Sequence, residues 1–161
     1  MVFSGIEFLY YFLPAVMLIY FFAPKRLKNL MLFVSGLGFY AWGEPIYVIV
    51  MIISTAVDYT AGMLMSKTEN EKKRRACLIV SIVINFGLLF TFKYSSFVVD
   101  TFNGIFRTSI PSPNLPLPIG ISFFTFQSMS YTIDLYRRKI NVQRSFINFA
   151  AYVTCFPQIV A

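Results

Sequence analysis

The chain has 161 residues, of which 57% are hydrophobic and 13% are charged, and its formal net charge is +7. This composition excludes a soluble domain and indicates an integral membrane protein. The sequence has no histidine, which excludes a histidine base, a serine–histidine hydrolase or a histidine zinc site for the chain as given. A nucleic-acid-binding protein is also excluded, because the basic residues form short clusters beside apolar segments.

Five apolar segments predict transmembrane helices, and a sixth apolar segment begins near Phe146. In chain order, the predicted spans lie near Phe8–Phe22, Leu30–Trp42, Ile46–Met65, Cys77–Val99 and Ile119–Tyr136. The second and third could form one kinked hairpin. No Lys or Arg precedes the first segment, so we expect it to be retained and not cleaved as a signal peptide. The predicted fold is all-α and polytopic.

Basic residues cluster in three of the predicted loops. The three clusters hold Lys25, Arg26 and Lys28; Lys67, Lys72, Lys73, Arg74 and Arg75; and Arg137, Arg138, Lys139 and Arg144. By the positive-inside rule this side is cytoplasmic, which predicts an N-terminus outside. We expect these charges to set the topology and to contact anionic lipid. The opposite side carries a long, proline-stiffened loop predicted from Asp100 to Pro116.

The fifth predicted span lies within the sequence LPIGISFFTFQSMSYTIDLYRR, residues 117–138, which carries polar residues on two faces. Pro118 is well placed to open this helix, because its φ is already helical. With 100° of rotation per residue around the helix axis, the polar residues fall into two sets. One set lies within an arc of about 60°, and the other spreads over another side of the helix. The first set is Gly120, Gln127, Tyr131, Asp134 and Arg138, and the second is Ser122, Thr125, Ser128, Thr132 and Tyr136. We therefore expect other helices or water around this helix.

The same segment, followed by CFPQIVA at residues 155–161, resembles the signature of the membrane-bound O-acyltransferase (MBOAT) family. Within that family the chain is most similar to the bacterial alginate O-acetyltransferases and the teichoic-acid D-alanylation membrane protein. The sequence FYAWGEP at residues 39–45 is a second, weaker match. Together the matches cover nearly the whole chain.

The resemblance implies an enzyme that transfers an acyl group, usually acetyl or D-alanyl, from a thioester donor to a hydroxyl of an exported polymer. The site would be a tunnel through the bilayer, in which the family's histidine removes the hydroxyl proton. That histidine lies in the later half of family members, so we expect no catalytic residue before Ala161. The chain ends within an apolar run. We expect residues 1–161 to be the N-terminal portion of one larger membrane domain and to be inactive alone.

The resemblance also implies the partners. The acyl thioester is a co-substrate, and we expect no bound cofactor and no metal. We expect contacts with the lipid bilayer, with the remaining helices of the full-length protein, with an extracytoplasmic acyltransferase partner and with the polysaccharide acceptor, but not with nucleic acid. The expected location is the bacterial cytoplasmic membrane, crossed several times.

Six residues are candidates for lining a substrate tunnel: Ser122, Gln127, Tyr131, Asp134, Pro157 and Gln158. Gln127 lies nearest to mid-membrane, where tunnel lining and interhelical hydrogen bonding are equal alternatives. Ser122 could instead bond a carbonyl one turn back. The last two residues, by resemblance, belong to a broken or re-entrant segment near the reaction chamber.

Other polar residues have competing explanations. Asp134 could form a local ion pair with Arg137 or Arg138 instead of lining a tunnel. A carboxylate at Asp58 needs a partner in the membrane, and we favour packing against another helix over substrate contact. Lys93 can extend to the outer interface beside Tyr94. The two cysteines, Cys77 and Cys155, are expected to be buried thiols without metal or redox chemistry.

Two further function classes remain open from the residues alone. One is a small transporter or channel whose intramembrane polar residues form a substrate path. The other is a non-catalytic membrane scaffold that binds another subunit.

Overall fold

The computed structural model describes residues 8–24, 27–43, 45, 47–106, 111 and 120–155, and all regular secondary structure within them is helical. The helices are η1 (Phe8–Phe12, a π-helix), α1 (Leu13–Phe22), α2 (Lys28–Gly43), α3 (Tyr47–Ser66), α4 (Glu71–Phe106), α5 (Ile121–Tyr136) and α6 (Phe146–Val153). The predicted all-α class is confirmed for this part of the chain. Within it, α3 and α4 are long and apolar enough to cross a membrane.

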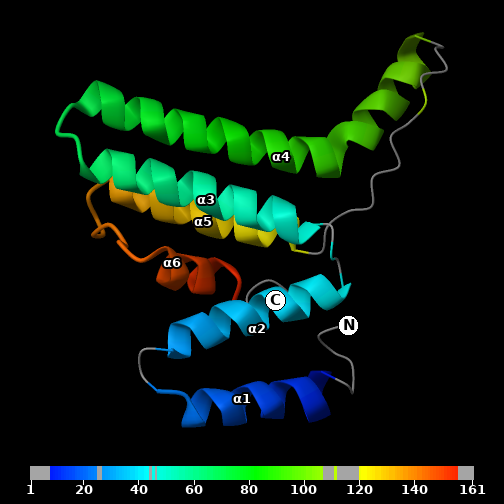
Figure 1. Ribbon diagram of the computed structural model, residues 1–161. Coiled ribbons are helices and arrows are strands. Elements are labelled where there is room, and N and C mark those ends of the chain that lie inside the picture. The colour runs from blue at the N-terminus through cyan, green and yellow to red at the C-terminus, as the bar shows by residue number, and fades with distance from the viewer. Residues whose placement is uncertain are drawn as a thin grey trace.

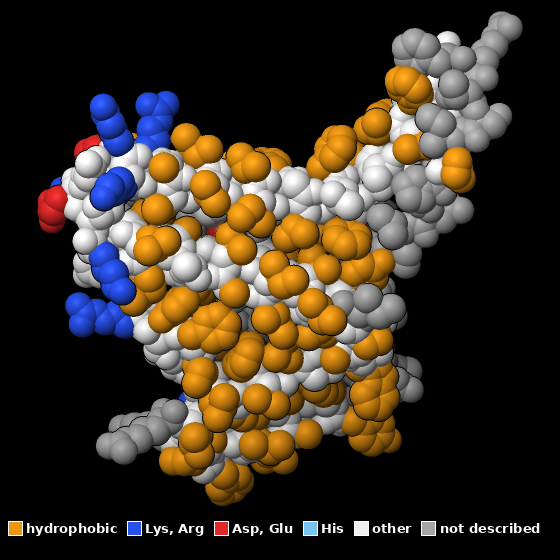
Figure 2. Space-filling model, turned by 45° about the horizontal axis from the view of Figure 1, so that its top comes forward, with side chains coloured by type: hydrophobic (Ala, Val, Ile, Leu, Met, Phe, Trp, Pro, Cys, Tyr) orange, Lys and Arg blue, Asp and Glu red, His pale blue; other side chains and the backbone are white. Residues whose placement is uncertain are grey.

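The helices are arranged in layers. Figure 1 shows α4 along one edge, α3 and α5 beneath it, α6 and α2 next, and α1 at the opposite edge. Helices α3, α4 and α5 contact one another, whereas α6 packs mainly on α2. Large apolar side chains are exposed on every helix, as on Phe21, Trp42, Val83 and Phe123, and they cover much of the surface in Figure 2.

Helix α4 is longer than the sequence predicted. It begins after Asn70, whose Oδ1 accepts a hydrogen bond from the Lys72 N–H at 3.0 Å, which satisfies one free donor of the first turn. It continues to Phe106, over 36 residues or about 54 Å. The start of the loop predicted from Asp100 was wrong, because residues 100–106 are helical and the first proline after Val99 is Pro111.

Helix α5 begins at Ile121, later than the predicted start. Its N-cap is Gly120, which has φ 73°, a left-handed conformation that glycine adopts without strain. Pro118 and Ile119, which were expected to open the span, lie outside the described residues.

A buried polar network joins α3 to α4. Asp58 is fully buried, and its Oδ1 accepts hydrogen bonds from Ser81 Oγ and from Asn85 Nδ2, the latter at 2.7 Å. The Asn85 Oδ1 in turn accepts from Ser54 Oγ. Ser128 of α5 also lies against the carboxyl group. Asp58 therefore has the helix-packing partners that the sequence led us to expect.

Two glycines allow helices to approach closely. A Cβ placed at Gly36 of α2 would lie 2.1 Å from the backbone oxygen of Thr154, at the end of α6. A Cβ at Gly62 of α3 would lie 3.1 Å from the ring of Tyr131 and 3.2 Å from Leu135 on α5. The first contact is with backbone, which cannot rotate away.

The close approach at Gly36 predicts a large effect of one methyl group. We expect Gly36→Ala to destabilise the protein by about 1–3 kcal/mol, because the methyl would overlap a carbonyl. The matched control is Gly38→Ala, two residues along the same helix, where the added Cβ meets nothing within 4 Å. Alanine favours a helix over glycine by about 1 kcal/mol, so the control should be neutral or stabilising. Thermal unfolding followed by circular dichroism measures both, and equal stabilities would contradict the packing of α2 on α6.

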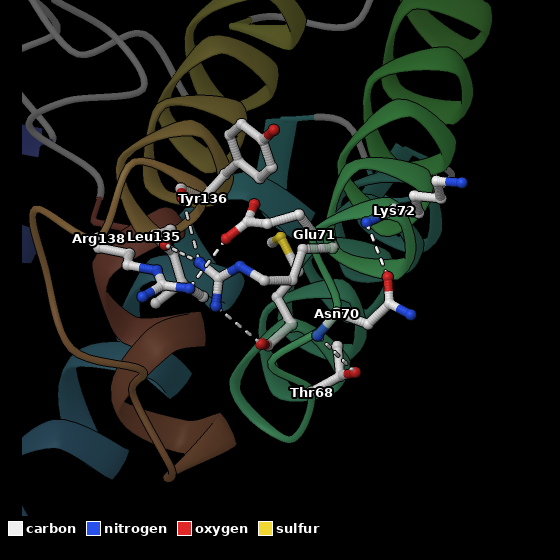
Figure 3. A network of polar contacts seen from close by, with 9 residues as sticks. Thr68, Asn70, Glu71, Lys72, Leu135, Tyr136 and Arg138 are labelled. Atoms are coloured by element: carbon white, nitrogen blue, oxygen red, sulfur yellow. Dashed lines mark hydrogen bonds and ion pairs between the residues drawn. The ribbon is translucent and has the colours of Figure 1, made fainter.

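Arg74 caps the ends of two helices. It is buried, its Nη1 donates to the Met65 carbonyl at 3.1 Å, and its Nη2 donates to the carbonyls of Leu135 and Tyr136, each at 3.1 Å (Figure 3). The last carbonyls of a helix have no intrahelical partner and carry partial negative charge. Arg74 thus holds the ends of α3 and α5 together. The sequence placed residues 72–75 in a loop, which was wrong because α4 begins at Glu71, and of these four basic residues Arg74 alone is buried.

Exposed charges gather at the same end of the molecule. Arg138 pairs with Glu71 at 2.9 Å, which brings the α5–α6 connection beside the start of α4 (Figure 3). Figure 2 shows Lys and Arg side chains collected at this end. The second and third basic clusters are therefore close in space. Lys25 and Arg26 lie outside the described residues.

The capping role of Arg74 predicts a contrast with its neighbour. We expect Arg74→Met to destabilise the protein by about 1–3 kcal/mol, because it leaves buried carbonyls without a donor. The control is Arg75→Met, the same chemical change at an exposed site. Chemical denaturation in detergent measures both, and a loss of the same size in the control would rule out the capping role.

Candidate functional site

A polar pocket of about 410 Å³ lies between α5, the connection of residues 137–145 and α6. Its polar lining residues are Ser130, Tyr131, Asp134, Asn141, Gln143, Asn148 and Tyr152. The lining holds one carboxyl group, three side-chain amides and three hydroxyls, so it can both donate and accept hydrogen bonds. The site is at the end of the molecule that carries the basic clusters.

The local sequence forms the pocket by turning the chain back over α5. Arg138 follows the helix with φ 58°, a left-handed conformation that commonly ends helices. The Tyr131 Oη then accepts a hydrogen bond from the Gln143 N–H at 2.9 Å. From α3, the Tyr59 Oη donates to the Arg144 carbonyl at 2.6 Å. These two hydroxyls fix the connection above the pocket.

Helix α6 forms the facing wall. Ser145 is its N-cap, and its hydroxyl accepts from the Asn148 N–H at 3.4 Å. Phe149 packs on Tyr131 with ring centroids 4.6 Å apart, and on Tyr59 at 6.2 Å. The aromatic contacts orient α6 so that Asn148 lines the pocket.

A second pocket of about 370 Å³ adjoins the first between α6 and α2. The two share Gln143, Asn148 and Tyr152. Across the second pocket, Asn29 Nδ2 donates to Asn148 Oδ1 at 2.9 Å. Polar surface therefore continues from α5 past α6 to α2.

The structure separates the predicted site residues into groups. Tyr131 and Asp134 line the first pocket. Gln127 lies one turn before Tyr131, and its Nε2 donates to the carbonyl of Tyr152 at 2.8 Å. Gln127 therefore makes the interhelical hydrogen bond that was one of its two expected roles, and it joins α5 to a residue of both pockets. Pro157 and Gln158 lie outside the described residues.

Two other assignments change. Asp134 does not form the local ion pair, because Arg138 pairs with Glu71, and Asp134 has no ion pair among the described residues. Ser122 lies toward the other end of α5, where its hydroxyl is 3.2 Å from the donor Lys93 Nζ. Lys93 Nζ also lies 5.7 Å from the centroid of the Tyr94 ring.

Sequence reasoning missed Asn29, Asn141, Gln143 and Asn148. Asn148 was the one with a usable signal, because it is an amide inside the apolar sequence FINFAAYV. In the part of the chain that is described, no three His, Cys, Asp or Glu side chains could hold a metal ion. Cys77 and Cys155 are free thiols and only partly buried. The described pocket is suited to binding polar groups.

Comparisons with known proteins find relatives that are all described as O-acetylases or O-acetyltransferases. The chain is 35% identical over its full length to the probable alginate O-acetylase AlgI of Pseudomonas aeruginosa, and covers 32% of that protein. It is 34% identical to the protein of the same description from Azotobacter vinelandii, covering 33% of it. A peptidoglycan O-acetyltransferase of Helicobacter pylori is 28% identical over 96% of this chain and 35% of its own length. No family model and no solved structure matches the chain. The chain spans about a third of the length of these relatives.

The Tyr131 hydroxyl predicts a testable property of the pocket. We expect Tyr131→Phe to loosen residues 137–145, because the Gln143 N–H loses its acceptor. Such a hydrogen bond contributes about 1 kcal/mol, so the equilibrium constant for local opening of the segment should rise about fivefold. The segment contains four tryptic sites, Arg137, Arg138, Lys139 and Arg144. Cleavage of the purified protein by trypsin, followed by mass spectrometry, measures the opening. Tyr152→Phe is the control, since no hydrogen bond of its hydroxyl is found among the described residues. Unchanged cleavage in Tyr131→Phe would show that the bond does not hold the segment.

Proposed function

The chain belongs to the membrane-bound O-acyltransferase family, and from this premise we propose that it is the amino-terminal portion of an enzyme that O-acetylates an exported cell-envelope polysaccharide. The donor would be an acyl thioester and the acceptor a sugar hydroxyl. The relatives named above act, by their descriptions, on alginate and on peptidoglycan. Both are polysaccharides outside the cytoplasm, so the acceptor class follows from what the two descriptions share.

In this proposal the chain supplies part of the wall of a tunnel. Polar backbone and side chains at membrane depth are tolerated where protein or water surrounds them. The pocket beside Asp134 meets that condition, because α5, α6 and the connecting segment enclose amides and a carboxyl group. Its position at the basic end supports entry of the donor from the cytoplasmic side. The polar surface that continues from α5 past α6 to α2 is the observation on which the assignment to a tunnel wall depends.

The catalytic base would come from the remainder of the enzyme. The sequence has no histidine, and the chain spans about a third of its relatives. In the reaction, a base takes the proton of the acceptor hydroxyl as its oxygen attacks the thioester carbonyl. The carbon–sulfur bond then breaks, and the thiol leaves with a proton. We expect the 161-residue chain alone to be inactive.

The proposed topology places the N-terminus outside and the protein in the bacterial cytoplasmic membrane. Helices η1 with α1, α2, α3, α4 and α5 would be the five spans of one membrane domain. Helix α6 has eight residues, about 12 Å, which is too short to cross the hydrocarbon core. It would form a re-entrant segment packed on α2. The remaining helices, an extracytoplasmic partner and the polysaccharide would complete the enzyme.

The tunnel role predicts an effect of Gln127→Leu in the full-length enzyme. The leucine cannot donate to the Tyr152 carbonyl, so the wall between α5 and α6 should shift while insertion is unaffected. We expect polymer acetylation to fall about tenfold, which corresponds to about 1.4 kcal/mol in the transition state. Acetyl content of the exported polymer is the measurement.

The control is Phe123→Leu, one turn earlier on α5, where the side chain is exposed. Its acetylation and its membrane level should match wild type. Wild-type acetylation by Gln127→Leu would remove this residue from the tunnel wall. If the purified enzyme instead moved solute into liposomes and transferred no acetyl group, the transporter hypothesis would replace the acyltransferase.

A further inference from the structure

A separate concave surface lies along α3 and α4, and it shares no lining residue with the two polar pockets. It is an apolar groove of about 550 Å³. Small side chains on both helices leave the space, among them Ala56, Ala61, Ala76 and Cys77. Larger aliphatic residues such as Leu64 and Val80 form its rims, and they are about half exposed.

The groove has the length of one lipid chain in one leaflet. On α3 its lining runs from Ile53 to Leu64, which is about 16 Å along the helix axis. Half of a hydrocarbon core is about 15 Å thick. A groove of that length that begins at the cytoplasmic end of α3 would reach the middle of the bilayer.

The two hydroxyls that line the groove already donate to groups of the protein, and the remaining polar group is the weakly polar thiol of Cys77. Thr60 donates its hydroxyl to the Ala56 carbonyl at 2.7 Å, and Ser81 donates to Asp58. The occupant is therefore apolar along this length.

One end of the groove is continued by three lysines. Lys67 directly follows the last residue of α3, and its N–H donates to the Leu64 carbonyl at 3.3 Å, so it lies one turn beyond that wall. Lys72 and Lys73 precede Ala76 and Cys77 by four residues each on α4, and extend the other wall. All three are exposed, and none has an ion pair among the described residues. Figure 2 shows the positive charge at this end.

Among the described residues, no acidic side chain forms an ion pair with these lysines. Glu71 is engaged by Arg138 at 2.9 Å, and Glu69 is exposed in the connection. Arg74 points inward to the helix ends, whereas Arg75 is exposed and adds to the positive charge. An apolar groove with cations at its cytoplasmic end matches a ligand with an anionic head and a hydrocarbon tail.

We propose that this groove binds an anionic phospholipid, with one acyl chain between α3 and α4 and the phosphate against Lys67, Lys72 and Lys73. The bound acyl chain covers the face of the α3–α4 pair on which Ser81 lies. The lipid thus contacts the same two helices that Asp58 joins, and its binding stabilises their packing.

The experiment uses the full-length protein in nanodiscs that contain phosphatidylglycerol with a diazirine at the end of one acyl chain. After irradiation, mass spectrometry maps the cross-linked peptides. We expect cross-links in the groove-lining parts of α3 and α4. Phosphatidylcholine with the same diazirine should label the groove much less. Labelling elsewhere but not in the groove, as would occur if another helix of the protein occupied it, overturns the proposal.

Two variants test the headgroup and the chain separately. The first variant combines Lys67→Gln, Lys72→Gln and Lys73→Gln. It should lose the preference for phosphatidylglycerol over phosphatidylcholine, and we expect the ratio of groove labelling by the two lipids to fall about fivefold for each lysine replaced. Its control removes three charges from the same side of the membrane: Arg137→Gln, Lys139→Gln, Arg144→Gln. Ala76→Phe fills the groove from an exposed position and should lower labelling by both lipids.

Labelling is compared only among variants that keep the elution volume of wild type in size-exclusion chromatography. An equal loss of preference in the two triple variants would show a general surface-charge effect and refute the specific site. Full labelling in Ala76→Phe would refute binding of the chain in the groove.

Discussion

The satisfaction of buried polar groups is the constraint on which this structure depends, because hydrocarbon offers them no water. Asp58 would be costly in a lipid-facing helix, yet here it is fully buried and hydrogen-bonded to Ser81 and Asn85. The bonds form only when α3 and α4 pack in one register. Arg74 imposes a similar condition on α3 and α5 by bonding the last carbonyls of both. The three-helix core is therefore specified by polar pairs as well as by apolar contact.

The same core explains why α5 carries polar residues on two faces. Thr125, Ser128 and Thr132 are buried, and Ser128 lies against the carboxyl of Asp58. Hydroxyls of Ser128 and Thr132 donate to carbonyls three residues back, so this face needs few outside partners. The other face presents Tyr131 and Asp134 to the pocket beside α6. One face thus serves the packing of the core and the other the candidate site.

The sequence predicted the features that depend on local pattern. Apolar runs located the helices, and polar residues within the fifth segment indicated surroundings other than lipid. What it could not predict depends on contacts between distant residues. Arg138 selects Glu71, 67 residues away, over the nearby Asp134. Arg74 bonds carbonyls 61 and 62 residues away. Gln143 and Asn148 join the site because a left-handed turn at Arg138 reverses the chain, which residue spacing alone does not reveal.

The shape of the pocket bears on what the rest of the enzyme must provide. Tyr152, on its rim, is about half exposed at 47%, and Asp134 is only partly buried. An open polar surface is unfavourable against lipid, so protein or water must cover it. The relatives are about three times as long as this chain, and in the proposed enzyme their further helices would supply that cover and the catalytic base. The apolar groove between α3 and α4 has no such requirement, because lipid itself can fill it. The polar pockets and the apolar groove therefore differ in the cover that they need, the pockets from protein or water and the groove from the bilayer.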